Sequence, residues 1–370
     1  MKNNSKKIMC LLTLAVIFAL ASCGNRGSKT GGNNISKSGG ENTESKSLTS
    51  YADADINEAI EDEFFALDTV INLKVYGSKR VEVLKKLEDK INELDELLST
   101  GKETSEVSKL NKSGKEVLSK TTADLVKKSL QIYEKTEGLF DITIYPLMEL
   151  WGFPTQNYRV PSDKEIAEKL EVVGSDKIIF NEDTREVSFK NQGLEIDFGG
   201  IGKGYITDEL VKILKEEKVE SAIINLGGNV FGYEKKPDGS LWNVAIRDPN
   251  VPESYMAVIR LENCAVITSG GYERFFEENG SIYHHILDPG SGKPSKSGLK
   301  SVSIVSKEGT LADALSTSLF IMGKEKAIDF WRKNGKGFDI ILLTDDNKLL
   351  VSEGISQQVE SENYQIQLIK

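Results

Sequence analysis

Two hydrophobic periods alternate along the chain after Phe64. From Val81 to Leu98 apolar residues recur every three or four positions with Lys and Glu between them, which predicts an amphipathic helix. A second helix is predicted from Asp124 to Glu137, where Gly138 ends it. Short apolar runs predict strands at 66–77, 222–234, 241–248, 255–262 and 301–306, and a hairpin at 177–189. Because strands and helices are segregated, the pattern predicts an α+β fold with one main domain and a smaller lobe around 151–192.

The first 22 residues have a different pattern. Three lysines precede an apolar run from Ile8 to Ala21, which is typical of a secretory signal and too short to span a bilayer. The run ends in the letters LASCG, which resemble the lipobox of bacterial lipoproteins. That resemblance implies acylation of Cys23 and removal of residues 1–22; a plain secretory signal with an incidental Cys is the alternative.

Residues 23–55 are dominated by Gly, Ser, Asn, Lys and Thr and have hardly an apolar side chain. Such a composition buries too little surface to fold, so we interpret the segment as a flexible tether and 56–370 as the folded domain. A lipid on Cys23 would hold the domain at the outer face of the bacterial cytoplasmic membrane, outside the cytoplasm. Cys264 would then be the one remaining cysteine, which excludes an intrachain disulfide.

The charge of the chain is acidic. The formal net charge is -10, and it becomes -13 when the three lysines of the signal are removed. An acidic body argues against nucleic acid as a partner and against electrostatic binding to a membrane surface.

The stretch IDFGGIGKGYITDEL, residues 196–210, places four glycines and Lys203 between an apolar run and a helix-like one. Strand, glycine-rich turn and helix is an arrangement that can hold a phosphate. The spacing fits neither the P-loop, which needs Ser or Thr where Gly204 stands, nor the dinucleotide fingerprint. The alternative is a tight turn whose glycines supply positive φ angles.

Two further features carry possible chemistry. His284 and His285 are the two histidines of the chain, and strand alternation would point them to opposite faces, so one of them could act as an acid or base. Asp313 and Thr317 are four residues apart and would share one helix face, where their oxygens suit Mg²⁺. Each feature also has an ordinary structural interpretation: a strand histidine beside a Tyr, and an exposed polar stripe on a packed helix.

Seven stretches, taken in order, resemble the ApbE family of FAD:protein FMN transferases. They are GLFDITIYPLMELWGF, IDFGGIGKGYITD, INLGGNVFGYE, WNVAIRDP, TSGGYERFF, YHHILDPGSGKP and ADALSTSLF. The resemblance extends over nearly everything after residue 60. It implies the family's α+β fold, which is related to the T-fold, with mixed and antiparallel sheets, packed helices and a single main catalytic domain.

The resemblance also implies a reaction. Such enzymes use Mg²⁺, with Mn²⁺ as the other candidate, to transfer the FMN half of FAD to a Thr or Ser hydroxyl of an acceptor flavoprotein, and they release AMP. The expected acceptors belong to membrane or extracellular electron-transfer systems. Two other functions remain open for the chain. One is a Mg²⁺-dependent FAD pyrophosphatase that gives FMN and AMP, and the other is a non-catalytic lipoprotein that binds FAD.

Matching the motifs residue by residue assigns the site. Gly200, Asp313 and Thr317 match the metal ligands, Asp197 and Lys203 match FAD contacts, and His285 with Asp313 would be catalytic. The remaining flavin contacts implied are Leu67, Leu139, Phe140, Asp141, Thr268, Ser269, Gly270, His285 and Ile286. The chain departs from the family pattern at Asp68, Gly202 and Gly271, none of which is a proposed metal ligand.

Overall fold

The computed structural model describes residues 58–370, and its first element is a hairpin. Strands β1 (Ile60–Ala66) and β2 (Thr69–Tyr76) pair antiparallel, and Leu67 and Asp68 form the two-residue turn between them. Both turn residues have positive φ, 55° and 56°, which is the backbone that a tight hairpin with right-handed strand twist requires. The two strands form one edge of the main sheet.

The main sheet has nine strands in the order β1-β2-β6-β7-β10-β15-β16-β17-β19. All neighbours are antiparallel except β17 and β19, which are parallel. The further strands are β6 (Ser221–Leu226), β7 (Asn229–Tyr233), β10 (Cys264–Gly270), β15 (Leu299–Ser306), β16 (Phe338–Thr344), β17 (Leu349–Ser352) and β19 (Ile366–Ile369).

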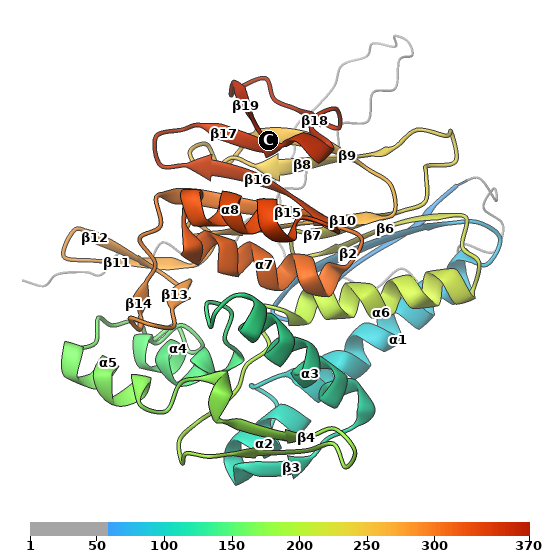
Figure 1. The fold of residues 1–370 in the computed structure, drawn as a ribbon. Coiled ribbons are helices and arrows are strands. Elements are labelled where there is room, and N and C mark those ends of the chain that lie inside the picture. Colours follow the sequence, from blue (N-terminus) through green and yellow to red (C-terminus); the bar gives the residue numbers. More distant parts are fainter. Residues whose placement is uncertain (1–57) are drawn as a thin grey trace, which may run out of the picture. The chain divides into compact units, whose positions relative to one another are not determined.

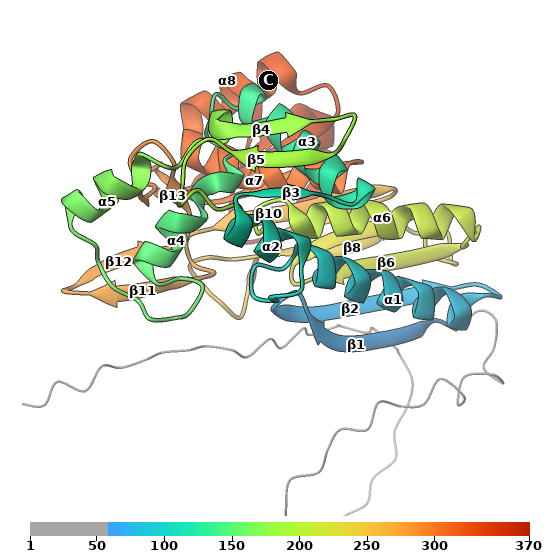
Figure 2. The same cartoon turned by 90° about the horizontal axis from the view of Figure 1, so that it is seen from below.

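Helices cover one face of this sheet, as Figures 1 and 2 show. They are α1 (Arg80–Leu98), α6 (Gly202–Glu216), α7 (Gly309–Met322) and α8 (Lys324–Asn334). A three-stranded sheet packs on the opposite face; it consists of β8 (Trp242–Arg247), β9 (Tyr255–Leu261) and β18 (Val359–Glu360). Strand alternation divides the core accordingly, because Ile340 and Leu342 face the helices while Ile341 and Leu343 face the small sheet.

The remaining elements lie beside the helical layer. They are α2 (Glu106–Ser113), β3 (Lys115–Val117), α3 (Lys120–Lys135), the 3-10 turn Ile142–Ile144, α4 (Tyr145–Trp151), α5 (Asp163–Leu170), the 3-10 turn Ser175–Lys177, β4 (Ile178–Asn181) and β5 (Glu186–Phe189). Two small hairpins follow β10: β11 (Phe275–Glu278) with β12 (Ser281–His284), and β13 (Leu287–Asp288) with β14 (Lys293–Pro294). A last 3-10 turn is Glu353–Ile355.

The α+β fold expected from the sequence is confirmed, and residues 58–370 lie within one compact unit. The predicted helix from Val81 matches α1, whereas the helix predicted from Asp124 begins earlier, at Lys120, because Ser119 caps it. The stretch 222–234 is divided into β6 and β7 by a turn at Gly227 and Gly228, both with positive φ.

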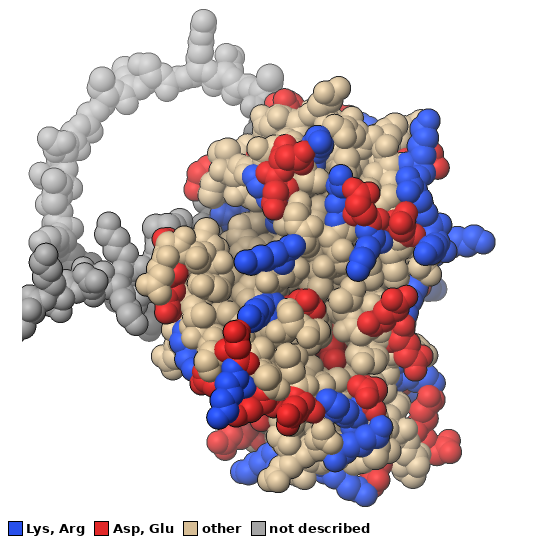
Figure 3. Space-filling view, turned by 60° about the vertical axis from the view of Figure 1, so that its left-hand side comes forward, with Lys and Arg blue, Asp and Glu red and all other residues tan. Residues whose placement is uncertain are grey.

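The predicted signal, the lipidation site Cys23 and the tether lie outside the described residues. Among the helices of residues 58–370, none combines the length and apolar character that a membrane span requires. On the face drawn in Figure 3, Lys and Arg side chains are interspersed with Asp and Glu.

Candidate active site

The glycine-rich segment leads into α6, and its glycines serve close packing. Gly199, Gly200, Gly202 and Gly204 all have φ outside the positive region, so the alternative interpretation, a tight turn whose glycines supply positive φ, is wrong. Gly204 instead lies against α7: a Cβ there would be 2.2 Å from the carbonyl oxygen of Gly309 and 2.6 Å from the Cβ of Asp313. The absence of a side chain therefore lets the two helices meet at backbone contact.

Asp313 of α7 lies at this contact. Its side chain is only 5% exposed, and its Oδ2 accepts a 2.8 Å hydrogen bond from the backbone N–H of Gly204. Burial raises the pKa of the carboxyl, although the nearby charge of Lys203 and the hydrogen bond from Gly204 oppose the shift. Asp313 is thus not part of an exposed polar stripe, and within residues 58–370 no Lys, Arg or His forms an ion pair with it.

Thr317 lies one turn after Asp313, next to the strand β10. Its Oγ1 is 3.2 Å from the Oγ of Ser269, which is also 2.7 Å from the Oγ of Ser316. A Cβ on Gly200 would be 3.9 Å from the same Thr317 oxygen. The structure therefore brings together the three residues expected to hold a metal.

These donors fit a hard divalent cation. In the described part of the chain, no three His, Cys, Asp or Glu side chains gather as a protein-only metal cluster. Mg²⁺ is nevertheless commonly held by one or two carboxylates, with water and substrate phosphates completing the shell. The buried Asp313 without an ion pair, the Thr317 hydroxyl and the Gly200 backbone offer that kind of partial shell.

Charged side chains surround this point. The charges of Lys203 and Arg274 act on Asp197 and Glu273, and Lys203 also acts on Asp313. By accessible surface Glu273 is exposed and Asp197 is half-buried, and the protein that crowds their carboxylates raises the pKa of Glu273 to about 7 and raises that of Asp197. Glu273 and Arg274 were not predicted as site residues. The sequence signal for them is a pair of adjacent opposite charges within the motif TSGGYERFF.

His285 follows β12 and lies in the same electrostatic environment. The side chain is half-buried by accessible surface, and partial loss of water around the ring, followed by the charge of Arg274, lowers the pKa of its imidazole to about 3. Its Nδ1 is 3.2 Å from the carbonyl oxygen of Arg274, so a neutral ring that donates from Nδ1 keeps Nε2 as an acceptor. His284 packs edge-on against Phe320 and hydrogen-bonds Ser295, while His285 lies near Phe153. The two rings therefore contact different residues.

The residues expected to contact flavin differ in their placement. Phe140 is 4% exposed, and its ring lies 3.5 Å from the Cβ position of Gly200. The neighbouring Leu139 and the turn residue Leu67 are partly buried, Leu67 against the main core. On β10, Thr268 bonds Ser303 through their hydroxyls, and Gly270 packs against Tyr272. The contacts of these residues with the flavin remain predictions.

Two of the expected flavin contacts are engaged within the fold. Asp141 is 8% exposed, and its carboxylate accepts hydrogen bonds from Thr143 and Ser175. Ile286 is a member of the main apolar core. Both are adjacent to Phe140 or His285 in the chain, so they fix the backbone from which those side chains extend.

The sequence pattern of a known family extends over most of this architecture. The ApbE family pattern matches residues 67–342, which include every site residue described above. The chain belongs to the ApbE family. Solved ApbE structures share its fold: the ApbE protein of Thermotoga maritima has 33% identity and a TM-score of 0.76 over 81% of this chain and 99% of that one.

Other ApbE proteins give the same relationship. The flavin transferase ApbE from Vibrio cholerae has 26% identity and a TM-score of 0.73, again over 81% of this chain and 99% of that one. The FAD:protein FMN transferase of Treponema pallidum is 31% identical over 314 residues, 79% of this chain and 86% of the relative. That of Escherichia coli K12 is 30% identical over 267 residues, 70% and 76% of the two chains.

Proposed function

We propose that this ApbE-family protein transfers the FMN half of FAD to a Thr or Ser hydroxyl of an acceptor protein and releases AMP, with Mg²⁺ bound at Gly200, Asp313 and Thr317. The observation that carries the proposal is the contact of α6 with α7. There the buried Asp313 bonds the backbone of Gly204 without forming an ion pair, and Thr317, one turn further along α7, lies close to Gly200. The names of the relatives support the reaction class.

The reaction is a displacement at phosphorus. The acceptor oxygen attacks the phosphorus of the FMN half, the bond to the bridging oxygen breaks, and that oxygen leaves with AMP. Bound Mg²⁺ would stabilise the negative charge that develops on the phosphates. No covalent intermediate on the enzyme is needed.

The protein's own residues bind and orient the reactants. Lys203 and Arg274 supply positive charge that can hold phosphate oxygens. His285 stays neutral because its pKa is low, and its Nε2 can accept the proton of the acceptor hydroxyl or orient that hydroxyl. Phe140, which is apolar and close to Gly200, can contact the flavin ring.

Intact mass spectrometry of an acceptor tests the transfer. The protein is incubated with FAD, Mg²⁺ and an acceptor that carries a Thr flavinylation site, and we expect an adduct of one FMN that EDTA prevents. Asp313→Asn should abolish the adduct, whereas the control Asp339→Asn should not. Asp339 is also a partly buried carboxyl with a raised pKa, but it bonds Ser352 in the sheet.

The same experiment distinguishes the rival activities. Free FMN and AMP with an unmodified acceptor would indicate a pyrophosphatase. FAD that stays intact with a series of acceptors would favour a binding protein.

We also propose that a lipid on Cys23 anchors the protein at the outer face of the cytoplasmic membrane, where it meets acceptors of electron-transfer systems. The signal-like N-terminal pattern supports this proposal. Metabolic labelling with a palmitate analogue tests it: the label should appear in the wild type and be lost in Cys23→Ala.

A further inference from the structure

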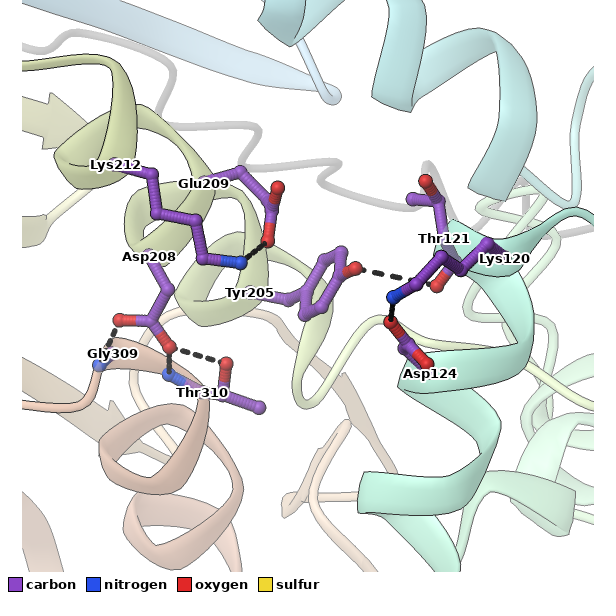
Figure 4. Close-up of polar contacts among 9 residues, drawn as sticks. All are labelled: Lys120, Thr121, Asp124, Tyr205, Asp208, Glu209, Lys212, Gly309 and Thr310. Atoms are coloured by element: carbon purple, nitrogen blue, oxygen red, sulfur yellow. Dashed lines mark hydrogen bonds and ion pairs between the residues drawn. The ribbon is translucent and has the colours of Figure 1, made fainter. Parts of the chain in front are cut away.

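The N-terminus of α7 is capped by a residue of another helix. The residue before α7, Glu308, makes no side-chain capping bond. Asp208 of α6 does so instead: its carboxylate accepts from the backbone N–H of Gly309 at 2.6 Å and of Thr310 at 2.9 Å, and from the Thr310 hydroxyl at 2.5 Å (Figure 4). A carboxylate is favourable there because the first N–H groups of a helix lack partners and carry partial positive charge.

This cap lies one helical turn from the contact between Gly204 and Asp313 on both helices. Gly204 and Asp208 are four residues apart on α6, and Gly309 and Asp313 are four residues apart on α7. Residues at this spacing share a helix face. The bond from Gly204 to Asp313 and the bonds from Asp208 to Gly309 and Thr310 are therefore successive links along one helix contact.

Two links one turn apart fix α7 relative to α6 more tightly than one link. Gly200 lies just before α6, whereas Asp313 and Thr317 extend from α7. Sliding or rotation of α7 would therefore separate the backbone of Gly200 from the two side chains. The cap resists that movement. The glycine contact also resists it, because the helix backbones are so close there that a Cβ on Gly309 would lie 2.6 Å from the carbonyl oxygen of Gly204.

We propose that Asp208 is a positioning residue for the divalent-cation site: by capping α7 from α6, it holds Asp313 and Thr317 at the place where they converge with Gly200. The inference rests on the proposed function for the existence of that site. Residues that orient metal ligands without touching the metal commonly change metal affinity 10-fold to 100-fold.

Binding of Mn²⁺ to the purified full-length protein tests the role. Free Mn²⁺ is followed by its electron paramagnetic resonance signal, with FAD present and no acceptor added. We expect Asp208→Ala to raise the Kd for Mn²⁺ about 10-fold or more. In a separate transfer assay with acceptor added, the KM of Asp208→Ala for FAD should stay near the wild-type value, and its kcat should recover at saturating Mn²⁺.

Three further variants separate positioning from stability. Ser162→Ala removes the cap of α5, where the Ser162 oxygen accepts from Glu165, and should lower stability without changing the Kd for Mn²⁺. Thr310→Val removes one of the three bonds to Asp208 and should weaken Mn²⁺ binding less than Asp208→Ala does. Thr310→Ser keeps the hydroxyl and should restore wild-type binding. If Asp208→Ala does not fold, the comparison of Thr310→Val with Thr310→Ser still tests the proposal.

Two results would overturn the proposal. One is a wild-type Kd for Mn²⁺ in folded Asp208→Ala or Thr310→Val, which would make the cap a contribution to stability alone. The other is the absence of Mn²⁺ binding by the wild-type protein, which would remove the cation site of the proposed function itself. FMN transfer to an acceptor in that second case would show that the activity survives without this site.

Discussion

Gly204→Ala tests the helix contact on which the candidate site depends. The new Cβ would lie 2.2 Å from the carbonyl oxygen of Gly309, whereas ordinary contacts begin at 3.4 Å. The helices must therefore separate by about 1.2 Å, the difference between these two distances. Overpacking of this kind typically costs about 1–3 kcal/mol, and the upper end applies here because the obstructing atoms belong to backbone.

Gly202→Ala is the matched control on the same helix. The nearest atom to its new Cβ would be the Cβ of Phe198 at 3.7 Å, which is ordinary contact. Replacing glycine by alanine in a helix stabilises by up to about 1 kcal/mol, and we expect about half of that in the first turn.

Urea unfolding followed by circular dichroism measures both variants, together with the Mg²⁺ dependence of FMN transfer. We expect Gly204→Ala to unfold at a clearly lower urea concentration and to lose transfer, and Gly202→Ala to match or exceed the wild type in stability while staying active. Equal midpoints and equal activities for the two variants would refute the reasoning, because α6 and α7 would then not meet at Gly204.

Three further predictions follow from buried or crowded charges. Asp313→Asn should abolish Mg²⁺-dependent transfer yet raise the melting temperature of the metal-free protein at pH 7, because the raised pKa of Asp313 means that its charge is unfavourable there; an equal or lower melting temperature in calorimetry would contradict this. Burial, followed by the hydrogen bond with Asp62, raises the pKa of Glu88 to about 7, so the stabilising effect of its bound proton is lost as pH rises from about 4.5 to about 7. Glu88→Gln should therefore increase the free energy of unfolding by roughly 1 kcal/mol at pH 8, after allowance for solvent screening, and leave it unchanged at pH 4; equal gains at both pH values would argue against the shift. His285 has a lowered pKa, so its contribution to stability is present above pH 6.5 and is lost as pH falls toward 3. His285→Gln should flatten this acid-side loss in pH-dependent unfolding, and the wild-type transfer rate should show no transition from His285 between pH 5 and 8.

Local patterns predicted a substantial part of the fold. The spacing of apolar residues identifies α1 closely, because a 19-residue helix buries one face against the sheet. The four-residue spacing of Asp313 and Thr317 correctly predicts one helix face, and the structure adds that Asp313 is buried on it while Thr317 is half-buried. Periodicity reports which side of an element faces the core, but it does not report what lies opposite.

Contacts between distant segments lie beyond such patterns. Gly204 and Asp313 are 109 residues apart in the chain, and Asp208 and Thr310 are 102 apart. The need for glycine at 204 arises from the close approach of α7 and not from a positive φ. The raised pKa of Glu273 likewise depends on the protein around its carboxyl, whose effect outweighs the opposing charge of Lys203 from another segment.

The stoichiometry of AMP and FMN tests the central claim most directly. In a single reaction with FAD, Mg²⁺ and acceptor, AMP is quantified by chromatography and the FMN attached to the acceptor by intact mass. Transfer at a site built on Asp313 predicts one AMP for each attached FMN, with both products absent from Asp313→Asn. AMP formed with free FMN and no adduct would contradict the account, and so would an undiminished adduct in the variant.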